Sequence, residues 1–263
     1  MQKIISWNVA SVRARLPLLL EFLKREQPDI VMLQEIKATE ENFPFFDFQV
    51  AGYSALISGQ KAYNGVAILT KHPIKNHRYA LAGFEDQARF VSTETENGIT
   101  LVSVYVPNGN PPEKDPMDTS RLEYKLRWME AFNRHVSDLL NQNKKLIIGG
   151  DFNVIERDTD VYNPEVFRNS ALMVEPVRQS YNWLNQLPIQ NMIRKFNPEP
   201  KTYSFWDFQG GAWFKNNGIL LDALWVSDTL TNGVQNALIY KDIRGEKGTS
   251  DHVPIGILLD DIL

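Results

Sequence analysis

Four short polar segments, each beside an apolar run, carry the residues of this chain whose types could do chemistry. An apolar run bounded by polar or turn residues is typical of a buried strand, and a polar residue just past it lies where a packed sheet opens to solvent. The residues are Asn8, Glu35, Asp151, Asn153, Asp251 and His252. Hard oxygen donors with one imidazole predict Mg²⁺-assisted hydrolysis of a phosphate ester.

A further carboxylate lies inside one of the apolar runs. Asp222 stands between Leu221 and Ala223, and a charge buried there without a partner would cost several kcal/mol, so it requires one. We expect that partner to be His252, because an imidazole oriented by a carboxylate recurs in catalytic sites.

Some of these residues also have a purely structural interpretation. Glu35 could simply pair with Lys37, and Asn8 could close a turn before the following helix. Asp151 and Asn153, two residues apart after Gly-Gly, could form a capped turn. Only their combination favours a catalytic site.

The composition bounds the class of protein. The 263 residues are 43% apolar and contain no linker-like or low-complexity tract, which predicts a single domain over residues 1–263. Cysteine is absent, so disulfides and thiolate zinc sites are excluded and a reducing compartment is expected. We see neither a signal peptide nor an apolar stretch of membrane-spanning length, and therefore expect a cytoplasmic monomer that does not bind membranes.

The net charge of −4 argues against a protein that coats nucleic acid by charge alone. It does not exclude a nuclease. A bound divalent cation reverses the field of an acidic cluster, and phosphate contacts then need only a local basic rim.

The apolar patterning predicts strands and helices interleaved along the chain. We expect strands at 2–9, 29–34, 53–58, 65–70, 88–95, 99–106, 145–150, 221–227 and 253–259. We expect helices at 11–26, at 120–141 with a capping box of Ser120 and Glu123, and at 176–187. Two strand-rich halves of this kind predict an α/β (α+β) fold, a four-layer α/β sandwich of two facing mixed β-sheets flanked by helices. The similar order of strand, helix and site residue in both halves is compatible with an internal duplication but does not establish one.

Eight segments then carry a resemblance over the whole chain. They are Ser-Trp-Asn-Val at 6–9, Leu-Gln-Glu at 33–35, Gly-Val-Ala-Ile-Leu-Thr-Lys at 65–71, Tyr-Val-Pro-Asn-Gly at 105–109, Arg-Leu-Glu-Tyr-Lys at 121–125, Gly-Asp-Phe-Asn-Val at 150–154, Tyr-Ser-Phe-Trp-Asp at 203–207 and Ser-Asp-His at 250–252. In order and spacing they resemble the exonuclease III family of abasic-site endonucleases, within the endonuclease/exonuclease/phosphatase superfamily. The segments at 121–125 and 203–207 indicate the DNA-repair branch rather than inositol phosphatases or sphingomyelinases.

The resemblance implies a metal site at one sheet edge. Glu35 would bind the catalytic Mg²⁺, for which Mn²⁺ could substitute, and Asn8 and Asp251 would lie close to the ion. The full set of implied metal-site residues is Asn8, Glu35, Asp151, Asn153, Asp251 and His252.

The resemblance also implies catalytic roles. Asp151 would activate the attacking water or protonate the leaving 3′ oxygen. Asn153 and Tyr105 would hold the scissile phosphate, although a tyrosine at a strand end is more often core packing. His252, oriented by Asp222, would donate to a phosphate oxygen or position the nucleophile.

By the same resemblance, the partner would be double-stranded DNA with abasic sites or blocked 3′ ends. The loop at 209–218, preceded by Phe205 and Trp206, would enter the duplex. Phe205, Ile219 and Leu221 would line an apolar pocket for a flipped sugar that has lost its base. Four residues would contact DNA from the rim, namely Arg13, Asn108, Arg121 and Lys247.

The implied function is a Mg²⁺-dependent DNA-repair nuclease. It would hydrolyse the phosphodiester 5′ to abasic sites in duplex DNA, with 3′→5′ exonuclease and 3′-phosphatase activity at DNA ends. Two alternatives stay open, a superfamily phosphatase acting on a phosphorylated small molecule or lipid, and a weakened nucleic-acid-binding module. Ala10, Gln209 and Leu220 depart from the family pattern, and the last two would lower the positive charge near the DNA.

Overall fold

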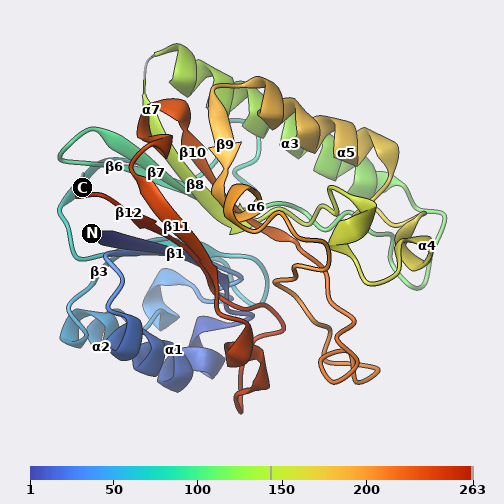
Figure 1. Cartoon of the computed structure of the whole chain (residues 1–263), viewed down its shortest axis with the longest axis horizontal. Coiled ribbons are helices and arrows are strands. Elements are labelled where there is room, and N and C mark those ends of the chain that lie inside the picture. The colour runs from blue at the N-terminus through green and yellow to red at the C-terminus, as the bar shows by residue number, and fades with distance from the viewer. Residues whose placement is uncertain (143, 262–263) are drawn as a thin grey trace.

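Within residues 1–142 and 144–261, which this computed structural model describes, twelve strands form two six-stranded mixed sheets that face each other (Figure 1). The first sheet has the order β11-β12-β1-β2-β4-β3, with bounds Val234–Ile239, Ile255–Leu259, Gln2–Asn8, Ile30–Gln34, Val66–Thr70 and Ser54–Ser58. The second has the order β5-β6-β7-β8-β10-β9, with bounds Ile74–Arg78, Phe90–Thr95, Ile99–Tyr105, Lys145–Asp151, Asp222–Ser227 and Ile189–Asn191.

Helices cover the outer faces of both sheets (Figure 1). The α-helices are α1 Val12–Glu26, α2 Phe45–Val50, α3 Ser120–Asn141, α4 Pro164–Phe167, α5 Glu175–Asn182, α6 Met192–Phe196 and α7 Asp228–Thr231. Short 3-10 helices are η1 Glu40–Asn42, η2 Asp158–Asp160, η3 Trp183–Gln186 and η4 Lys241–Gly245. None of the helices in the described ranges is long and apolar enough to span a bilayer.

Three apolar layers explain why this sequence forms a sandwich. Successive side chains of a strand point to opposite faces, so Ile4 packs between the two sheets while Ile5 packs in the layer beneath α1 and α2. On the other side, Trp128 and Phe132 of α3 pack with strand residues of the second sheet. The predicted four-layer α/β sandwich is confirmed.

The two sheets repeat one topology. In each, a central parallel pair is joined through a helix, β1-α1-β2 and β7-α3-β8, and the remaining neighbours are antiparallel in the same order. This is the arrangement that an internal duplication predicts. It brings the carboxyl ends of both central pairs to one edge of the sandwich, where the site lies.

The sequence interpretation missed three strands and misplaced one helix cap. β5, β9 and β11 are the short or half-exposed strands at sheet edges, so their apolar patterning is weak. The helix expected at 176–187 divides into α5 and η3. The expected Ser120 capping box is wrong, because the N-cap of α3 is Thr119, whose Oγ1 donates to Glu123 at 2.7 Å.

Candidate active site

Strand register places three of the predicted residues in one row of the second sheet. Tyr105 of β7 lies opposite Asp151 of β8, and Asp151 lies opposite Asp222 of β10. Paired residues of neighbouring strands project from the same face about 5 Å apart. The backbone hydrogen bonds of the sheet therefore fix the spacing of these side chains.

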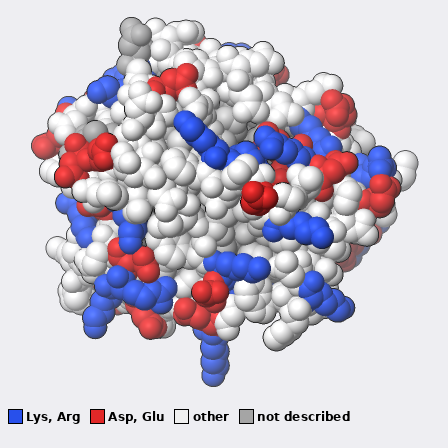
Figure 2. Space-filling view, in the orientation of Figure 1, with Lys and Arg blue, Asp and Glu red and all other residues white. Residues whose placement is uncertain are grey.

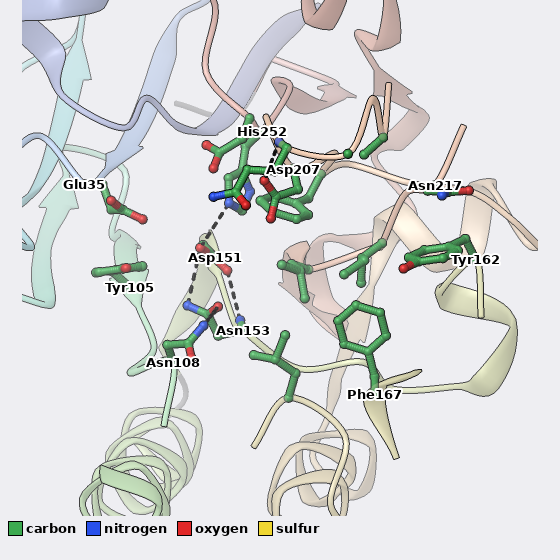
Figure 3. Close-up of a pocket in the computed structure, with 18 residues that line it drawn as sticks. Glu35, Tyr105, Asn108, Asp151, Asn153, Tyr162, Phe167, Asp207, Asn217 and His252 are labelled. Carbon is green, nitrogen blue, oxygen red and sulfur yellow. Dashed lines mark hydrogen bonds and ion pairs between the residues drawn. The ribbon is translucent and has the colours of Figure 1, made fainter. Parts of the chain in front are cut away.

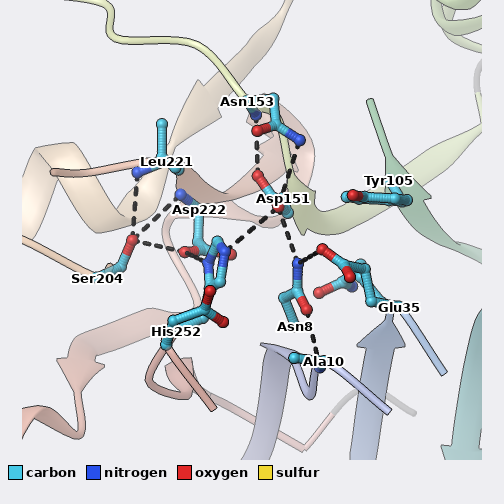
Figure 4. Close-up of polar contacts among 12 residues, drawn as sticks. Asn8, Ala10, Glu35, Tyr105, Asp151, Asn153, Ser204, Leu221, Asp222 and His252 are labelled. Carbon is cyan, nitrogen blue, oxygen red and sulfur yellow. Dashed lines mark hydrogen bonds and ion pairs between the residues drawn. The ribbon is translucent and has the colours of Figure 1, made fainter. Parts of the chain in front are cut away.

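The first sheet brings Asn8 and Glu35 to the same edge. Asn8 ends β1 opposite Gln34, the last residue of β2, and Glu35 follows with a left-handed φ of 50°. The Asn8 amide nitrogen donates to Glu35 Oε1 and to Asp151 Oδ2, both at 2.9 Å (Figure 4). Asn8 therefore links the two sheets across the site.

The hydrogen bonds of Asn8 use both atoms of its amide group. Its amide oxygen accepts the Ala10 N–H at 3.0 Å, and its amide nitrogen faces the carboxylates of Glu35 and Asp151. Asn8 thereby helps to orient the carboxylates of Glu35 and Asp151.

His252 lies between two buried carboxylates, as Figure 4 shows. Its Nδ1 is 2.8 Å from Asp222 Oδ2 and its Nε2 is 3.5 Å from Asp151 Oδ2. The predicted pairing of Asp222 with His252 is thus present. Burial disfavours the charged imidazole, but the carboxylates of Asp222 and Asp151 outweigh it and raise the pKa of His252 to about 10. The structure therefore favours an imidazolium at neutral pH.

Asp151 and Glu35 differ in the direction in which their pKa values are shifted. Burial raises the pKa of Asp151 above its usual range, although the His252 charge acts in the opposite direction. Burial also opposes the ionisation of Glu35, but hydrogen bonds from Asn8 and Lys37 outweigh it and lower the pKa of Glu35. A carboxyl that exchanges a proton and one that stays charged thus stand side by side. Glu35 also makes the simpler ion pair with Lys37, at 2.8 Å.

Asn153 and Tyr105 complete the polar centre. Asn153 has a φ of 49°, its backbone N–H donates to Asp151 Oδ1 at 2.9 Å, and its side-chain oxygen accepts from Asn108 at 3.2 Å. Burial and the nearby carboxylates of Glu35 and Asp151 hold the pKa of Tyr105 well above 10, so its phenol stays a hydrogen-bond donor.

The donor set fits a hard divalent cation. Glu35, Asp151 and Asp251 all line the cavity described below, and carboxylate oxygens are the ligands that Mg²⁺ and Mn²⁺ prefer. Asp151, Asp222 and His252 also place potential ligand atoms within 4.8 Å of one another. Both ring nitrogens of His252 also face these carboxylates.

A cavity of about 600 Å³ opens over this centre. In Figure 3, Glu35 and Tyr105 lie on one side of Asp151 and His252, while Tyr162 and Phe167 lie on the other. Phe205, Ile219 and Leu221 line the cavity as expected. The cavity thus joins a charged half to an apolar half.

Four contributing residues were missed by sequence reasoning. Tyr162, Phe167 and Leu172 extend the apolar wall, and the available signal was two aromatic residues close together in a segment for which we predicted no helix or strand. Ser204 donates its hydroxyl to Asp222 Oδ2 at 2.6 Å, a contact between distant segments that no local pattern reveals.

Trp206 does not take the expected DNA-facing position. Its side chain is 0% exposed and packs in the layer beneath α1, with Nε1 donating to Asn216 at 3.2 Å. An aromatic residue beside a loop has the same sequence signature whether it points inward or outward, which is why the expectation was wrong. Leu220 is also buried.

The loop after Trp206 presents a different aromatic ring. Phe214 is 91% exposed, while Trp213 packs edge-on against Trp206 at 5.1 Å. Trp213 therefore anchors the loop and Phe214 forms its exposed apolar tip.

The four residues expected at the DNA-facing rim are exposed to solvent. Arg13, Asn108, Arg121 and Lys247 are exposed, and Arg121 lines a second groove beside the site with Asn108 and Arg89. Basic and acidic side chains are interspersed on the face shown in Figure 2.

This fold and site define a class. Residues 5–252 match the model of the endonuclease/exonuclease/phosphatase family, and the chain belongs to that family. Within it, the chain is similar to the exonuclease III and abasic-site endonuclease group, which confirms the resemblance carried by the sequence motifs.

Curated relatives support this placement. An exodeoxyribonuclease of Bacillus subtilis is 29% identical over 98% of this chain and 99% of its own length. A DNA-(apurinic or apyrimidinic site) endonuclease of Dictyostelium discoideum is 30% identical over 98% of this chain and 70% of its own length.

Solved structures agree with them. The 3′ phosphatase NExo from Neisseria, bound to a product DNA hairpin, superposes with a TM-score of 0.92 at 29% identity, covering 99% of this chain and 100% of its own. An AP endonuclease from Archaeoglobus fulgidus gives the same TM-score, identity and coverage. The family match, the relatives and the similar structures together show that the protein is a hydrolytic nuclease.

Proposed function

We propose that the protein is a Mg²⁺-dependent DNA-repair nuclease. It hydrolyses the phosphodiester 5′ to an abasic site in duplex DNA, and at DNA ends it removes 3′ nucleotides and 3′-phosphates. The observation that carries the proposal is the row of Tyr105, Asp151 and Asp222, with His252 held between the two carboxylates beside an apolar cavity (Figures 3 and 4).

The chemistry divides among few residues. Asp151, whose pKa is raised by burial, exchanges the proton of the attacking water or of the leaving 3′ oxygen. His252, charged and held by Asp222, donates to a non-bridging phosphate oxygen. Asn153 and Tyr105 hold the phosphate by hydrogen bonds.

Glu35 and Asp251, with Asp151 adjacent, would hold Mg²⁺ or Mn²⁺. The ion, when bound, supplies charge stabilisation on the phosphoryl oxygens. Asn8 fixes the orientation of Glu35 through the hydrogen bond described above.

Substrate choice comes from the apolar half of the cavity. Phe205, Ile219 and Leu221, backed by Tyr162 and Phe167, receive the extruded sugar. A nucleotide without a base has no stacking to lose, so its extrusion costs less than that of an intact nucleotide. This lets the enzyme prefer damaged DNA without reading its sequence.

The exposed loop tip supplies the contact to the duplex. Phe214 enters the stack beside the lesion, as apolar wedges do in other DNA-bending proteins. Arg13, Arg121 and Lys247 contact phosphates from the rim. We further propose that residues 1–263 form a single domain that acts as a cytoplasmic monomer.

One incubation tests the function. Duplexes carrying an abasic-site analogue, a 3′-phosphate or no damage are incubated with the protein, with and without Mg²⁺, and the product ends are resolved. Cleavage 5′ to the analogue that leaves a 3′-hydroxyl and requires Mg²⁺ is expected. Equal rates on abasic and undamaged duplex would leave only a general nuclease, and hydrolysis restricted to small phosphate esters would indicate the superfamily phosphatase instead. An Asp151→Asn preparation controls for contaminating nuclease.

A further inference from the structure

A lysine of α3 is buried directly behind the phosphate-binding residues. The Lys125 side chain is 0% exposed, and no ion pair is found for it among the described residues. Its Nζ lies 3.1 Å from Asn108 O, 2.6 Å from Asn153 O and 2.8 Å from Ala171 O. An ammonium has three N–H donors, and each has one carbonyl acceptor here. Burial lowers the pKa of Lys125 to about 7, and the negative charge of Asp151 acts in the opposite direction.

The three carbonyls belong to three separate loops of the cavity. Asn108 follows β7 and Asn153 follows β8, and their side chains are hydrogen-bonded to each other at 3.2 Å (Figure 3). Ala171 precedes Leu172, part of the apolar wall. One side chain thus joins the loops of the polar half to a loop of the apolar half.

The surrounding backbone is shaped to this lysine. Gly109 has a φ of 84°, and a Cβ at that position would lie 2.7 Å from Lys125 Cδ and 3.2 Å from Ala171 Cβ. The chain therefore passes directly over the lysine stem. Simple packing would be served by an apolar residue without the desolvation cost of a charge, so the ammonium itself has a task.

We propose that Lys125 is a positioning residue for phosphate cleavage. Its ammonium fixes the backbone of Asn108 and Asn153 so that their amides meet the scissile phosphate, and it sets the apolar wall against them. This inference rests on the proposed function, because that function assigns Asn153 to the phosphate.

The test replaces the ammonium and keeps the stem. Lys125→Met retains the aliphatic chain and loses all three donors. The matched control is Lys3→Met, because Lys3 also donates to a backbone carbonyl, Glu26 O at 2.8 Å, away from the cavity. With abasic duplex and saturating Mg²⁺, we expect kcat of Lys125→Met to fall about 100-fold, the loss that displaced catalytic groups produce. KM should change little, and Lys3→Met should keep the wild-type kcat.

A double-mutant cycle separates positioning from general destabilisation. Asn153→Ala is introduced into the wild type and into Lys125→Met. If Lys125 acts through Asn153, the second substitution costs much less in the variant background than in the wild type. Additive losses in kcat, or a Lys125→Met kcat within threefold of wild type, would overturn the inference.

A milder variant keeps the test decisive if Lys125→Met does not fold. Lys125→Gln retains an N–H donor of shorter reach, so it should recover part of the lost kcat and show the same non-additivity with Asn153→Ala. If the proposed function is wrong, the unmodified protein will not cleave at abasic sites. If only the role of Lys125 is wrong, the unmodified protein will cleave there and the Lys125 variants will not show the expected loss of kcat.

Discussion

Asp222 holds His252 through a 2.8 Å contact between Oδ2 and Nδ1. The same carboxylate oxygen accepts the Ser204 hydroxyl at 2.6 Å, so its position is set by two partners as well as by the β10 backbone. The ring therefore has one orientation available, with Nε2 toward Asp151.

The Asp222→Asn substitution should remove the contact that fixes the orientation of the His252 ring. An amide can neither stabilise the imidazolium nor accept equally from both partners, so kcat on abasic duplex should fall roughly 10³- to 10⁴-fold, as when an orienting carboxylate is lost elsewhere. DNA binding, measured by fluorescence anisotropy, should stay near the wild-type value. A kcat within tenfold of wild type would remove Asp222 from the mechanism.

The titration of His252 can be followed directly in the metal-free protein. Its pKa is raised to about 10, so NMR of the labelled ring should show the imidazolium through neutral pH. Because the folded-state pKa lies above the ordinary value near 6.5, the pairing stabilises the fold fully below about pH 6.5 and this stability is lost as pH rises toward 10. Urea unfolding at several pH values should show that decline, and His252→Asn should reduce it. A ring that titrates near pH 6.5 would contradict the prediction.

Glu35 and Asp151 should fail in different ways when substituted. Glu35→Ala should lose Mg²⁺-dependent turnover together with Mg²⁺ binding, because it removes a carboxylate from the ion site. Asp151→Asn is nearly isosteric but cannot exchange a proton, so it should bind DNA and Mg²⁺ yet lose about 10²- to 10⁴-fold in kcat. Calorimetry with Mg²⁺ and single-turnover cleavage distinguish the two variants. Near wild-type cleavage by Asp151→Asn would rule out its assigned role.

The apolar pocket should set the preference for damaged DNA. Leu221→Ala should relax discrimination against undamaged duplex by enlarging the pocket, and removing this buried side chain should cost about 2–5 kcal/mol of stability. Phe205→Ala should weaken abasic-site cleavage more than end trimming. The measurement is the ratio of kcat/KM on abasic and intact duplexes, alongside the unfolding midpoint. An unchanged ratio in both variants would mean that selectivity arises outside the pocket.

Phe214 should matter for lesions inside a duplex and hardly for the fold. Its ring is 91% exposed, so Phe214→Ala should alter stability by less than about 0.5 kcal/mol. Cleavage at an internal abasic site should fall severalfold while 3′-phosphate removal at an end persists. Phe46→Ala, at another exposed phenylalanine (75%) on α2, is the matched control and should leave both activities unchanged. Equal losses in both assays would exclude a wedge.

The central strands and the polar edge were predictable because each follows from a local pattern. β2 is buried along its whole length, which produces an uninterrupted apolar run, and Glu35 stands directly after it. Asp222 was also predictable, since a charge in such a run demands a partner.

What escaped prediction depends on contacts between distant segments. Ser204 meets Asp222 from another loop, and Lys125 meets Asn153 from α3. Trp206 was expected to face DNA but is buried, because composition alone does not reveal whether an aromatic residue beside a loop points inward or outward. The family resemblance implied roles for the motif residues but did not predict the contacts of Ser204 with Asp222 or of Lys125 with Asn153.

Segments that are far apart in the sequence meet at the catalytic centre. This limits when the centre can form while the chain is being synthesised. Asn8 closes β1, whereas His252 precedes β12, the strand that pairs with β1. A nascent chain still lacking residues 222–259 has neither the imidazole nor the strand that completes the first sheet. The catalytic centre therefore cannot form until residues 222–259 have left the ribosome.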